Sequence, residues 1–553
     1  MAVLRAATGA WRAGRPRHWT NGVPADAAAP AGPAGPGPVP ASPAGRPAGR
    51  SRAGGGMSAA SRLIRTAPEA APGHHWLDAA GWAALPAALA ADPALEFWGL
   101  WAEPGRVHAA FRDGISLLLA SLEVPEGRYP ALSPARPAAA WFERMVADLW
   151  GLAAEGGTDS RPWLDHGRWP ATAPLSDHPG HQTGEPPQPV FLPLEGQGLH
   201  QYPLGPILPG AGPGHWRAHV RGEAVHRLEA RLGYGHRGLL GLMRGKSPRA
   251  AARLVARLSA EATVAHGWAF AQAAEAAAGI EAPPRAVLLR LVLAEWERLA
   301  CHLSDWGGTM GAIGLEWAQV RCAMLREKLL RAHEAAFGQR LPLDLVLPGG
   351  LASDLTPEGA EALLAALAAL EEDLPTLQAV QDEHAGAQDR LRGIGGVSPA
   401  RVAALAAGGV AGRAGGRNFD ARRDMPYQPY PGFSLAIPTA SSGDAEARLR
   451  LRLRELPESL GLIRAALARL EPGPVLVPLP VGAGEGVGVV EGPRGEVLHW
   501  LALDEAGLIR AAFARDPGWM HVPLLEAAVP GTTLGDLPLV RASLNPSTSG
   551  MDL

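Results

Sequence analysis

Two short stretches, far apart in the chain, decide how the rest is interpreted. Residues 257–266 read RLSAEATVAH, and residues 545–553 read NPSTSGMDL. The first stretch lies inside an apolar pattern over residues 248–278, which a Ser-Pro pair precedes and a glycine follows, so the pattern predicts one long helix. Both stretches carry small residues at spaced positions, namely Ser259, Ala262, Ser547 and Gly550.

Composition places the chain among globular proteins with two to four domains, because it has 553 residues of which 47% are hydrophobic. Its formal net charge of -3 gives no case for nucleic acid as a partner. Two cysteines, Cys301 and Cys322, are too few for a disulfide framework or a four-cysteine metal site. No run of about 18 apolar residues lacks charges, so we expect membrane association only through partners.

Composition shifts divide the chain into four parts. Residues 1–70 are predicted to be a disordered low-complexity tail, or to include a start codon assigned too early, with Met57 as the true start; a transit peptide is the weaker alternative. A first domain follows over residues 75–160, then a linker rich in Pro, Gly and His over 161–192, and a second domain over 193–553.

Alternating and helical periodicities predict an α+β fold. The first domain is expected to hold helices over residues 82–91 and 137–152 and strands over 96–101, 107–111 and 116–124. The second is expected to open with a hairpin about Arg221-Gly222 and to continue with long helices over 248–278, 284–306, 315–337, 356–384 and 444–470. Strands are then expected over 485–491 and 495–501.

Several motifs resemble one group of redox complexes. WFER at 141–144 and DLWGL at 148–152 resemble the C-type subunit of bacterial NADH:quinone oxidoreductase (complex I). GYGHRG at 233–238 and EGVGVVEGPRGEVLHW at 485–500 resemble the D-type subunit of complex I and the large subunit of formate hydrogenlyase-type NiFe hydrogenases. The resemblance implies a small N-terminal α+β docking domain fused to a hydrogenase-large-subunit-like domain with a long-helix bundle and peripheral β-hairpins.

The two opening stretches resemble the metal motifs of that family, R-x-C-G-x-C-x-x-x-H and D-P-C-x-x-C. The four thiolates are replaced, because Ser259, Ala262, Ser547 and Gly550 stand at the cysteine positions. Nickel and iron that are normally held by soft thiolates have no equivalent ligands here. The resemblance therefore implies that this chain binds no metal and that iron-sulfur clusters belong to partner subunits.

Two further positions depart from the family. The acid of H-R-G-x-E-K is Leu240 here, and the histidine of G-P-x-H, which complex I uses with a quinone, is Leu208. Neither hydrogen chemistry nor the usual quinone binding is therefore matched residue by residue.

Four residues are candidates for catalysis in a buried chamber. Glu295, Arg298 and His302 share one helix face, and the family places that face between the large subunit and its iron-sulfur partner. They either relay protons or form a structural network. Arg494 matches the arginine over the family's metal, and it either orients a ligand or pairs with Glu491 or Glu485. The other candidates, as cofactor-binding or supporting residues, are Arg257, His266, His215, Tyr234, His236 and Arg237.

Loss of the thiolates predicts a specific geometry. Ser259 and Ser547 should approach each other in the fold, with Arg494 near them and with polar space left beside them.

The resemblance implies a subunit of a membrane-associated, hydrogenase-related oxidoreductase that acts on NAD(P)H and quinone or a related donor and acceptor. Its partners would be an iron-sulfur small subunit, a ferredoxin-like subunit and ion-pumping membrane subunits, and it would lie on the cytoplasmic face of the membrane. The chamber would take a quinone or another small molecule. The alternatives are a structural coupling subunit with no ligand and an atypical NiFe hydrogenase large subunit.

Overall fold

The computed structural model describes residues 58–207 and 212–553. Gly56–Leu553 forms one compact unit. The tail expected over residues 1–70 extends too far, because Ala59–Arg65 forms helix α1 and Glu69–Ala71 forms strand β1. The hydroxyl of Ser58 accepts a hydrogen bond from a backbone N–H in the first turn of α1 and so caps that helix. The rest of the predicted tail, with Met57, and the substituted position Leu208 lie outside the described residues.

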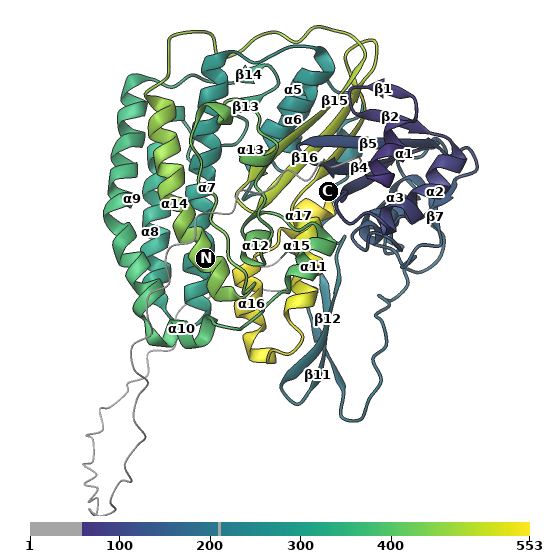
Figure 1. The fold of residues 1–553 in the computed structure, drawn as a ribbon, viewed down its shortest axis with the longest axis horizontal. Helices are drawn as coiled ribbons and strands as arrows, with labels where there is room; N and C mark the ends of the chain where they lie inside the picture. Colours follow the sequence, from purple (N-terminus) through teal and green to yellow (C-terminus); the bar gives the residue numbers. More distant parts are fainter. Residues whose placement is uncertain (1–57, 208–211) are drawn as a thin grey trace, which may run out of the picture. The chain divides into compact units, whose positions relative to one another are not determined.

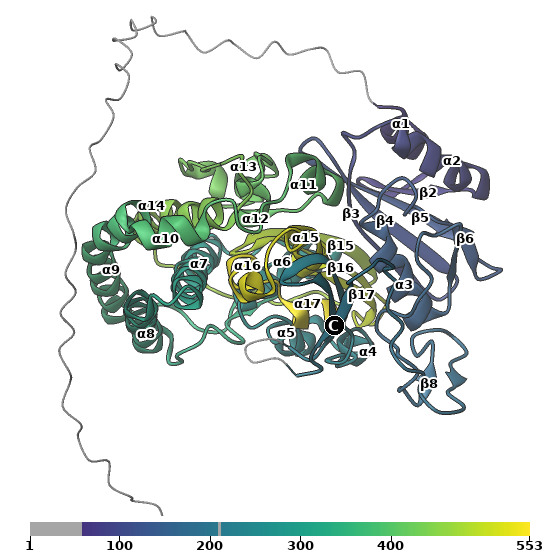
Figure 2. The same cartoon turned by 90° about the horizontal axis from the view of Figure 1, so that it is seen from below.

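A five-stranded sheet forms the first block, in the order β1-β2-β5-β4-β3 (Figures 1 and 2). Its other strands are β2 His74–Leu77, β3 Glu96–Glu103, β4 Arg106–Asp113 and β5 Ser116–Glu123. β2 runs parallel to β5, and the remaining pairs are antiparallel. Gly105 and Gly114 adopt positive φ angles of 70° and 63° in the two tight turns. The three strands predicted here are therefore confirmed.

Two helices accompany this sheet, α2 Ala79–Ala90 and α3 Ala139–Trp150. Of the charged residues of α3, Glu143 and Arg144 are buried and Asp148 is half-buried, and all three bind loops and not one another. Glu143 accepts hydrogen bonds from the backbone N–H groups of Leu132 and Ser133. Asp148 accepts three from residues 163–165, and Arg144 donates to two carbonyl oxygens at 161–162. These contacts attach the segment after α3 to the block.

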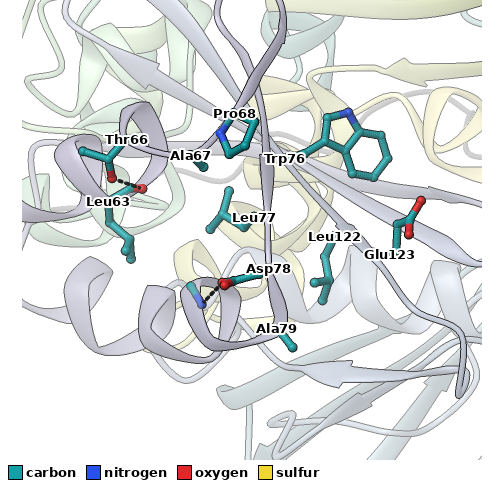
Figure 3. Close-up of a pocket in the computed structure, with 11 residues that line it drawn as sticks. Leu63, Thr66, Ala67, Pro68, Trp76, Leu77, Asp78, Ala79, Leu122 and Glu123 are labelled. Carbon is teal, nitrogen blue, oxygen red and sulfur yellow. Dashed lines mark hydrogen bonds between the residues drawn. The ribbon is translucent and has the colours of Figure 1, made fainter.

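A pocket of about 670 Å³ opens between α1, β2, α2 and β5 (Figure 3). Apolar side chains such as Leu63, Leu77 and Leu122 line much of it. Asp78 also lines it, but its carboxylate accepts a hydrogen bond from the backbone N–H of Gly81 and so caps α2. None of the sequence-predicted site residues lines this pocket.

Four long helices pack as a bundle, α7 Pro284–Ala312, α8 Glu316–Phe337, α9 Pro357–Glu383 and α14 Ala445–Leu467 (Figures 1 and 2). α7 contacts both α8 and α14, and α9 contacts α8 and α14. α7 does not end at Gly307 as predicted. A Cβ atom on Gly307 would lie 2.7 Å from Cβ of Cys322, so this glycine permits close packing of α7 on α8.

The helix predicted over residues 248–278 is two helices, α5 Pro248–Val255 and α6 Thr263–Ala278. The intervening turn carries Ser259 and Ala262. Contacts from elsewhere in the fold stabilise the break, because the carboxylate of Glu297 on α7 accepts the N–H groups of Val264 and Ala265 in the first turn of α6. Local periodicity does not report such contacts, which is why the prediction of one helix was wrong.

A second sheet, β15 Gly484–Gly492, β16 Gly495–Leu503 and β17 Ile509–Arg515, packs against α6. Its two predicted strands are confirmed. Three alternate glycines of β15 face the helix: Cβ atoms on Gly484, Gly486 and Gly488 would lie 2.1, 2.1 and 1.9 Å from carbonyl oxygens of α6. The glycine repeat therefore lets the helix backbone lie directly on the strand.

The predicted hairpin is confirmed as β11 His215–Arg221 and β12 Ala224–Arg231, with β10 His200–Leu204 beside β11 (Figure 1). The remaining strands are β6 Arg128–Pro130, β7 Ala153–Glu155, β8 Ala171–Thr172, β9 Gly180–His181, β13 Val346–Leu347 and β14 Gly350–Leu351. The remaining helices are α4 Leu239–Met243, α10 Ala385–Leu391, α11 Pro399–Leu405, α12 Gly409–Ala414, α13 Ala421–Asp424, α15 Gly518–Ala528, α16 Leu537–Leu544 and α17 Thr548–Asp552, with 3₁₀ turns at Tyr430–Gly432 and Leu534–Asp536.

These elements confirm the α+β class. In the described ranges, no helix is both long and apolar enough to cross a membrane.

Candidate functional site

The α5–α6 turn and the start of α17 meet at two serines. The hydroxyl oxygens of Ser259 and Ser547 lie 3.0 Å apart, and both residues are buried. Ser547 also accepts a hydrogen bond from the N–H of Gly550 and lies 3.2 Å from the hydroxyl of Ser549. The predicted approach of Ser259 and Ser547 is thus confirmed, and the hydroxyls satisfy one another without a further ligand.

Asp516, which the sequence analysis did not single out, covers the remaining side of this cluster. A Cβ atom on Gly550 would lie 2.3 Å from Cγ of Asp516, so the carboxylate occupies the space beside the glycine. Asp516 binds Nε2 of His266 at 2.9 Å, and Nδ1 of His266 lies 3.0 Å from Nε2 of His499. Burial opposes ionisation of Asp516, but the bond from His266 holds its pKa below the usual value.

His499 completes this row, and burial drives its pKa well below the usual value, so its ring is neutral. Across residues 58–207 and 212–553, no group of three or more His, Cys, Asp or Glu side chains is arranged to hold a metal ion. His266 thus lies in a hydrogen-bonded row with an aspartate and a second histidine, and it reaches the serine cluster only through Asp516.

Arg494 has a carboxylate partner that differs from both predicted ones. Its guanidinium binds Asp305 at 2.9 Å and lies 3.6 Å from Glu261, and it forms no ion pair with Glu491 or Glu485. Asp305 also accepts a hydrogen bond from the side-chain amide of Asn545 at 2.7 Å. Although burial opposes ionisation, Arg494 and Arg452 lower the pKa of Asp305 to about 2. Arg494 thus reaches the tail through Asp305.

The three predicted residues of α7 lie in a buried network between α7, α13, α14 and β15. Glu295 binds Arg298 at 3.1 Å and Arg422 at 3.0 Å, and it accepts hydrogen bonds from the hydroxyls of Tyr430 and Ser459. Although burial opposes ionisation, Arg422 and Arg298 lower the pKa of Glu295 to about 2.

The same network continues along α7 and onto β15. Arg298 donates to the carbonyl oxygens of Glu491 and Gly492, and His302 lies 2.9 Å from Glu455. Burial, with Asp420 and Glu496 nearby, raises the pKa of Glu491 to about 8. Arg413 contacts Glu491 at 3.3 Å and also binds Asp420 and Glu455, so the carboxylates and the arginines 298, 413 and 422 form one connected buried network.

The segment at 233–237 binds the tail. The backbone N–H groups of Gly233 and Gly235 donate to the carboxylate of Asp552, and the ring of His236 bonds its carbonyl oxygen. Arg237 donates to the carbonyl oxygens of Arg257, Leu258 and Ser549, and so joins the α5–α6 turn to α17. The predicted residues His236 and Arg237 thus hold the two metal-motif stretches together.

His215 and Tyr234 lie farther along this surface, with ring centroids 5.0 Å apart. Tyr234 stacks on His166 at 4.6 Å, so its ring is positioned by the linker. Neither residue contacts the serine cluster through a hydrogen bond in the described part of the chain. These two rings help to position the 233–237 segment and are not part of the serine cluster.

A half-enclosed pocket of about 390 Å³ opens beside the serine cluster, between the α5–α6 turn, α7, α8 and the tail. Its wall is largely apolar, with Trp296, Ala300 and Leu330 among the lining residues. Of the predicted candidates, Arg257 and Arg237 line it, whereas Glu295, Arg298, His302 and Arg494 do not. Arg257 is half exposed and binds Asp344 at 2.5 Å. The opposite face of α7 thus borders the pocket, which corrects the expected orientation.

Sequence reasoning missed other ionisable residues of this pocket. Glu297 and Cys301 both lie on its wall and are buried. Burial raises the pKa of Glu297 to about 8 and that of the Cys301 thiol well above its usual value. Glu297 lies between the predicted residues Glu295 and Arg298 in the sequence. The helical period was the signal that could have placed its side chain on the other face of α7. No local sequence pattern marks Asp516.

Comparisons with known proteins agree with this architecture. Residues 313–480 match the family model described as respiratory-chain NADH dehydrogenase, 49 Kd subunit, and residues 109–183 match the corresponding 30 Kd subunit. Hydrogenase-4 component G of Escherichia coli is 28% identical over 452 residues, which are 78% of this chain and 77% of that protein. The D-type subunit of the NADH-quinone oxidoreductase of Dehalococcoides mccartyi is 30% identical over 355 residues, which are 62% of this chain and 95% of that protein.

A solved structure shares the fold. It is described as the membrane-bound sulfane sulfur reductase, an archaeal respiratory membrane complex, and the aligned chain has a TM-score of 0.62 at 24% identity. The alignment covers 66% of this chain and 100% of that chain.

Proposed function

Because this chain belongs to the family of the D-type subunit of NADH-quinone oxidoreductase, we propose that it is the large subunit of a membrane-associated oxidoreductase related to complex I and to membrane-bound hydrogenases. It works without a nickel-iron centre. The complex transfers electrons between NAD(P)H, or a related donor, and a quinone or a related acceptor.

The observation that carries the proposal is the closed contact between Ser259 and Ser547. A nickel-iron centre held by four thiolates does not fit these residues, because the two hydroxyls bond each other at 3.0 Å. Ala262 offers a methyl group, and Asp516 fills the space beside Gly550. The residues around the two metal motifs are thus retained, while the residues at the cysteine positions contact other protein groups.

Electron transfer is assigned to partner subunits, since the relatives are subunits of multi-subunit complexes by their descriptions. An iron-sulfur small subunit, a ferredoxin-like subunit and ion-pumping membrane subunits are the proposed partners. This chain supplies the docking surface and the pocket beside the serines. We place it peripherally, on the cytoplasmic face of the membrane.

The pocket is the proposed ligand site. Its 390 Å³ and largely apolar wall suit the ring of a quinone or another small acceptor, and Arg237, Arg257 and Glu297 supply polar groups at its border. Glu297 is a neutral acid at pH 7, so it can donate a hydrogen bond to a carbonyl oxygen.

Purification of the native complex tests the assignment. We expect iron-sulfur and membrane subunits in the purified material, no nickel by elemental analysis and no hydrogen uptake. Stoichiometric nickel would show that the chain is an atypical hydrogenase large subunit. Recovery of the chain alone, without such partners, would contradict the proposed complex.

A pocket-filling variant separates a ligand-binding subunit from a purely structural one. Ser304 is exposed and lines the pocket, so Ser304→Phe should block it at little cost in stability. We expect electron transfer in the assembled complex to fall about tenfold or more, equivalent to about 1.4 kcal/mol. The matched control is Ala368→Phe at an exposed position of α9. Equal activity of the two variants would favour the structural coupling subunit.

A further inference from the structure

The pocket beside the serine cluster carries more positive charge than its own acids balance. Three arginines line it, namely Arg237, Arg257 and Arg326. Its other ionisable lining residues include two acids and one histidine, namely Glu261, Glu297 and His333. The contacts of these side chains decide which kind of ligand suits the pocket, because a charge that borders an apolar space needs a partner.

Only Arg257 has a carboxylate partner among the described residues. It binds Asp344 through two hydrogen bonds of 2.5 and 2.8 Å. The guanidinium of Arg237 donates to three backbone carbonyl oxygens, which carry no charge to balance its own. Arg326 lies half-buried on α8 and makes no hydrogen bond, ion pair or ring contact with any residue that the structure describes. Two guanidinium groups thus border the pocket with no carboxylate in contact.

The acids and the histidine of the wall do not supply that counter-charge. Glu261 lies 3.6 Å from Arg494, which is outside the pocket lining, and its side chain is 45% exposed. Glu297 accepts two backbone N–H groups of α6, and burial raises its pKa to about 8, so it is neutral at pH 7. Nδ1 of His333 lies 2.6 Å from the carbonyl oxygen of Gln339, and burial lowers the pKa of this ring. The wall therefore has a net positive charge at neutral pH.

The rest of the wall is apolar. Trp296 and Ala300 of α7 and Leu330 of α8 lie on it, together with the loop residues 341–343 that follow α8. The volume of about 390 Å³ has room for a ring system, whereas one acidic side chain of a partner subunit would fill only a small part of it. Apolar surface beside an unpaired guanidinium suits a molecule with a ring at one end and an anion at the other.

We propose that the ligand of this pocket is an organic anion, a ring that carries a carboxylate or a phosphate, and that Arg326 binds its acidic group. This inference rests on the proposed function, which assigns a small acceptor to the same pocket, and it adds the charge of that acceptor. A guanidinium forms two parallel hydrogen bonds with either kind of anion, so the inference names the chemistry that the two anions share.

Arg326 allows a clean test because it has no partner in the described residues to lose. Arg326→Gln removes the charge without leaving a buried carboxylate unpaired, so the chain should fold as wild type does. Arg326→Lys keeps a positive charge but loses the paired hydrogen bonds. The matched control is Arg331→Gln, which removes the same charge from a position of α8 that is 76% exposed and outside the pocket lining.

Isothermal titration calorimetry on the full-length chain compares three probes that share one ring system: 2-naphthoate, 2-naphthyl phosphate and the neutral 2-naphthol. We expect at least one anion to bind wild type about tenfold more tightly than 2-naphthol, and its relative affinity against the other anion distinguishes carboxylate from phosphate. Arg326→Gln should remove most of this preference, Arg326→Lys should keep part of it, and Arg331→Gln should bind as wild type does. Ser304→Phe should block every probe, which locates them in this pocket.

Three results would overturn the inference: equal binding of 2-naphthol and both anions, anion binding that Arg326→Gln leaves unchanged, or no binding of either anion. If 2-naphthol alone binds and Ser304→Phe blocks it, the pocket takes a neutral acceptor, so the proposed function stands and only the charge of the ligand is wrong. Failure of the proposed function has a different sign. Ser304→Phe and Ala368→Phe would then transfer electrons equally in the complex, whatever the affinity for anions.

Discussion

Ser259 and Ser547 lie 288 residues apart in the sequence, yet their hydroxyl oxygens are 3.0 Å apart and both residues are buried. This contact joins the turn between α5 and α6 to the first residue before α17. The two serines stand at positions where the motifs that the sequence resembles carry cysteines, and here a hydrogen bond between protein groups joins the two segments.

A double-mutant cycle measures that contact. Ser259→Ala, Ser547→Ala and the double variant are compared by chemical denaturation. We expect each single change to cost about 1 kcal/mol and the coupling energy to be about 0.5 to 1.5 kcal/mol, as for a neutral buried hydrogen bond. Additive single effects would mean that the hydroxyls do not bond in solution.

Gly550 should not tolerate any side chain. Because a Cβ atom there would lie 2.3 Å from Cγ of Asp516, Gly550→Ala must displace the carboxylate that binds His266. We expect a loss of about 2 to 4 kcal/mol in the free energy of unfolding. Gly461→Ala is the control, since Gly461 is an exposed position in α14 with open space around it, and the change there should stabilise by up to about 1 kcal/mol. Similar effects at both sites would contradict the packing of Asp516.

Glu297 predicts a dependence of stability on pH. Its folded-state pKa is raised to about 8, so the folded protein binds this proton more tightly than the unfolded chain. The contribution is therefore complete below the usual pKa of about 4.5 and is lost as the pH rises toward 8. Glu297→Gln keeps an oxygen to accept an N–H from α6 and cannot ionise.

We expect the stability of Glu297→Gln to vary less than that of wild type between about pH 5 and about pH 8. Urea unfolding at several pH values measures this difference. Parallel curves would show that Glu297 is already ionised at neutral pH in the folded protein.

Arg494→Ala should act on assembly and stability together. The change removes the closest charged partner of Asp305, which is only 1% exposed at its side chain, although Arg452 and Asn545 remain. We expect a loss of about 3 kcal/mol. Arg464→Ala, which breaks an ion pair whose side chains are 38% and 55% exposed, should cost less than about 1 kcal/mol. A normally assembled Arg494→Ala complex with impaired electron transfer would instead assign Arg494 to the ligand.

Removal of residues 1–56 should leave assembly of the complex unchanged. The segment has too few large apolar residues to form a core, and the first helix of the described residues begins at Ala59. Co-purification of partner subunits with a chain that starts at Met57 measures the effect. Loss of the partners would assign a docking role to the segment.

The sequence by itself determined the order of elements and the meeting of two distant stretches. Strands β3, β4 and β5 follow from alternating apolar residues between glycine turns, and β15 from its glycine repeat. The resemblance to two family motifs predicted that Ser259 lies opposite Ser547, because motifs that meet in a shared fold identify residues that are close in space. These features depend on local backbone preferences or on a shared fold, and sequence patterns indicate both.

Only the tertiary structure decided how charges are paired and where helices break. The split between α5 and α6 depends on Glu297, which lies on another helix. Arg494 pairs with Asp305 and not with the glutamates that are nearer in the sequence. His74 contacts Glu485 at 3.1 Å, although the two residues are 411 positions apart in the sequence. A buried charge must find a partner within about 4 Å, and which partner is within reach depends on the packing of whole elements. The spacing of residues along the sequence does not predict which charged groups come within that distance of each other.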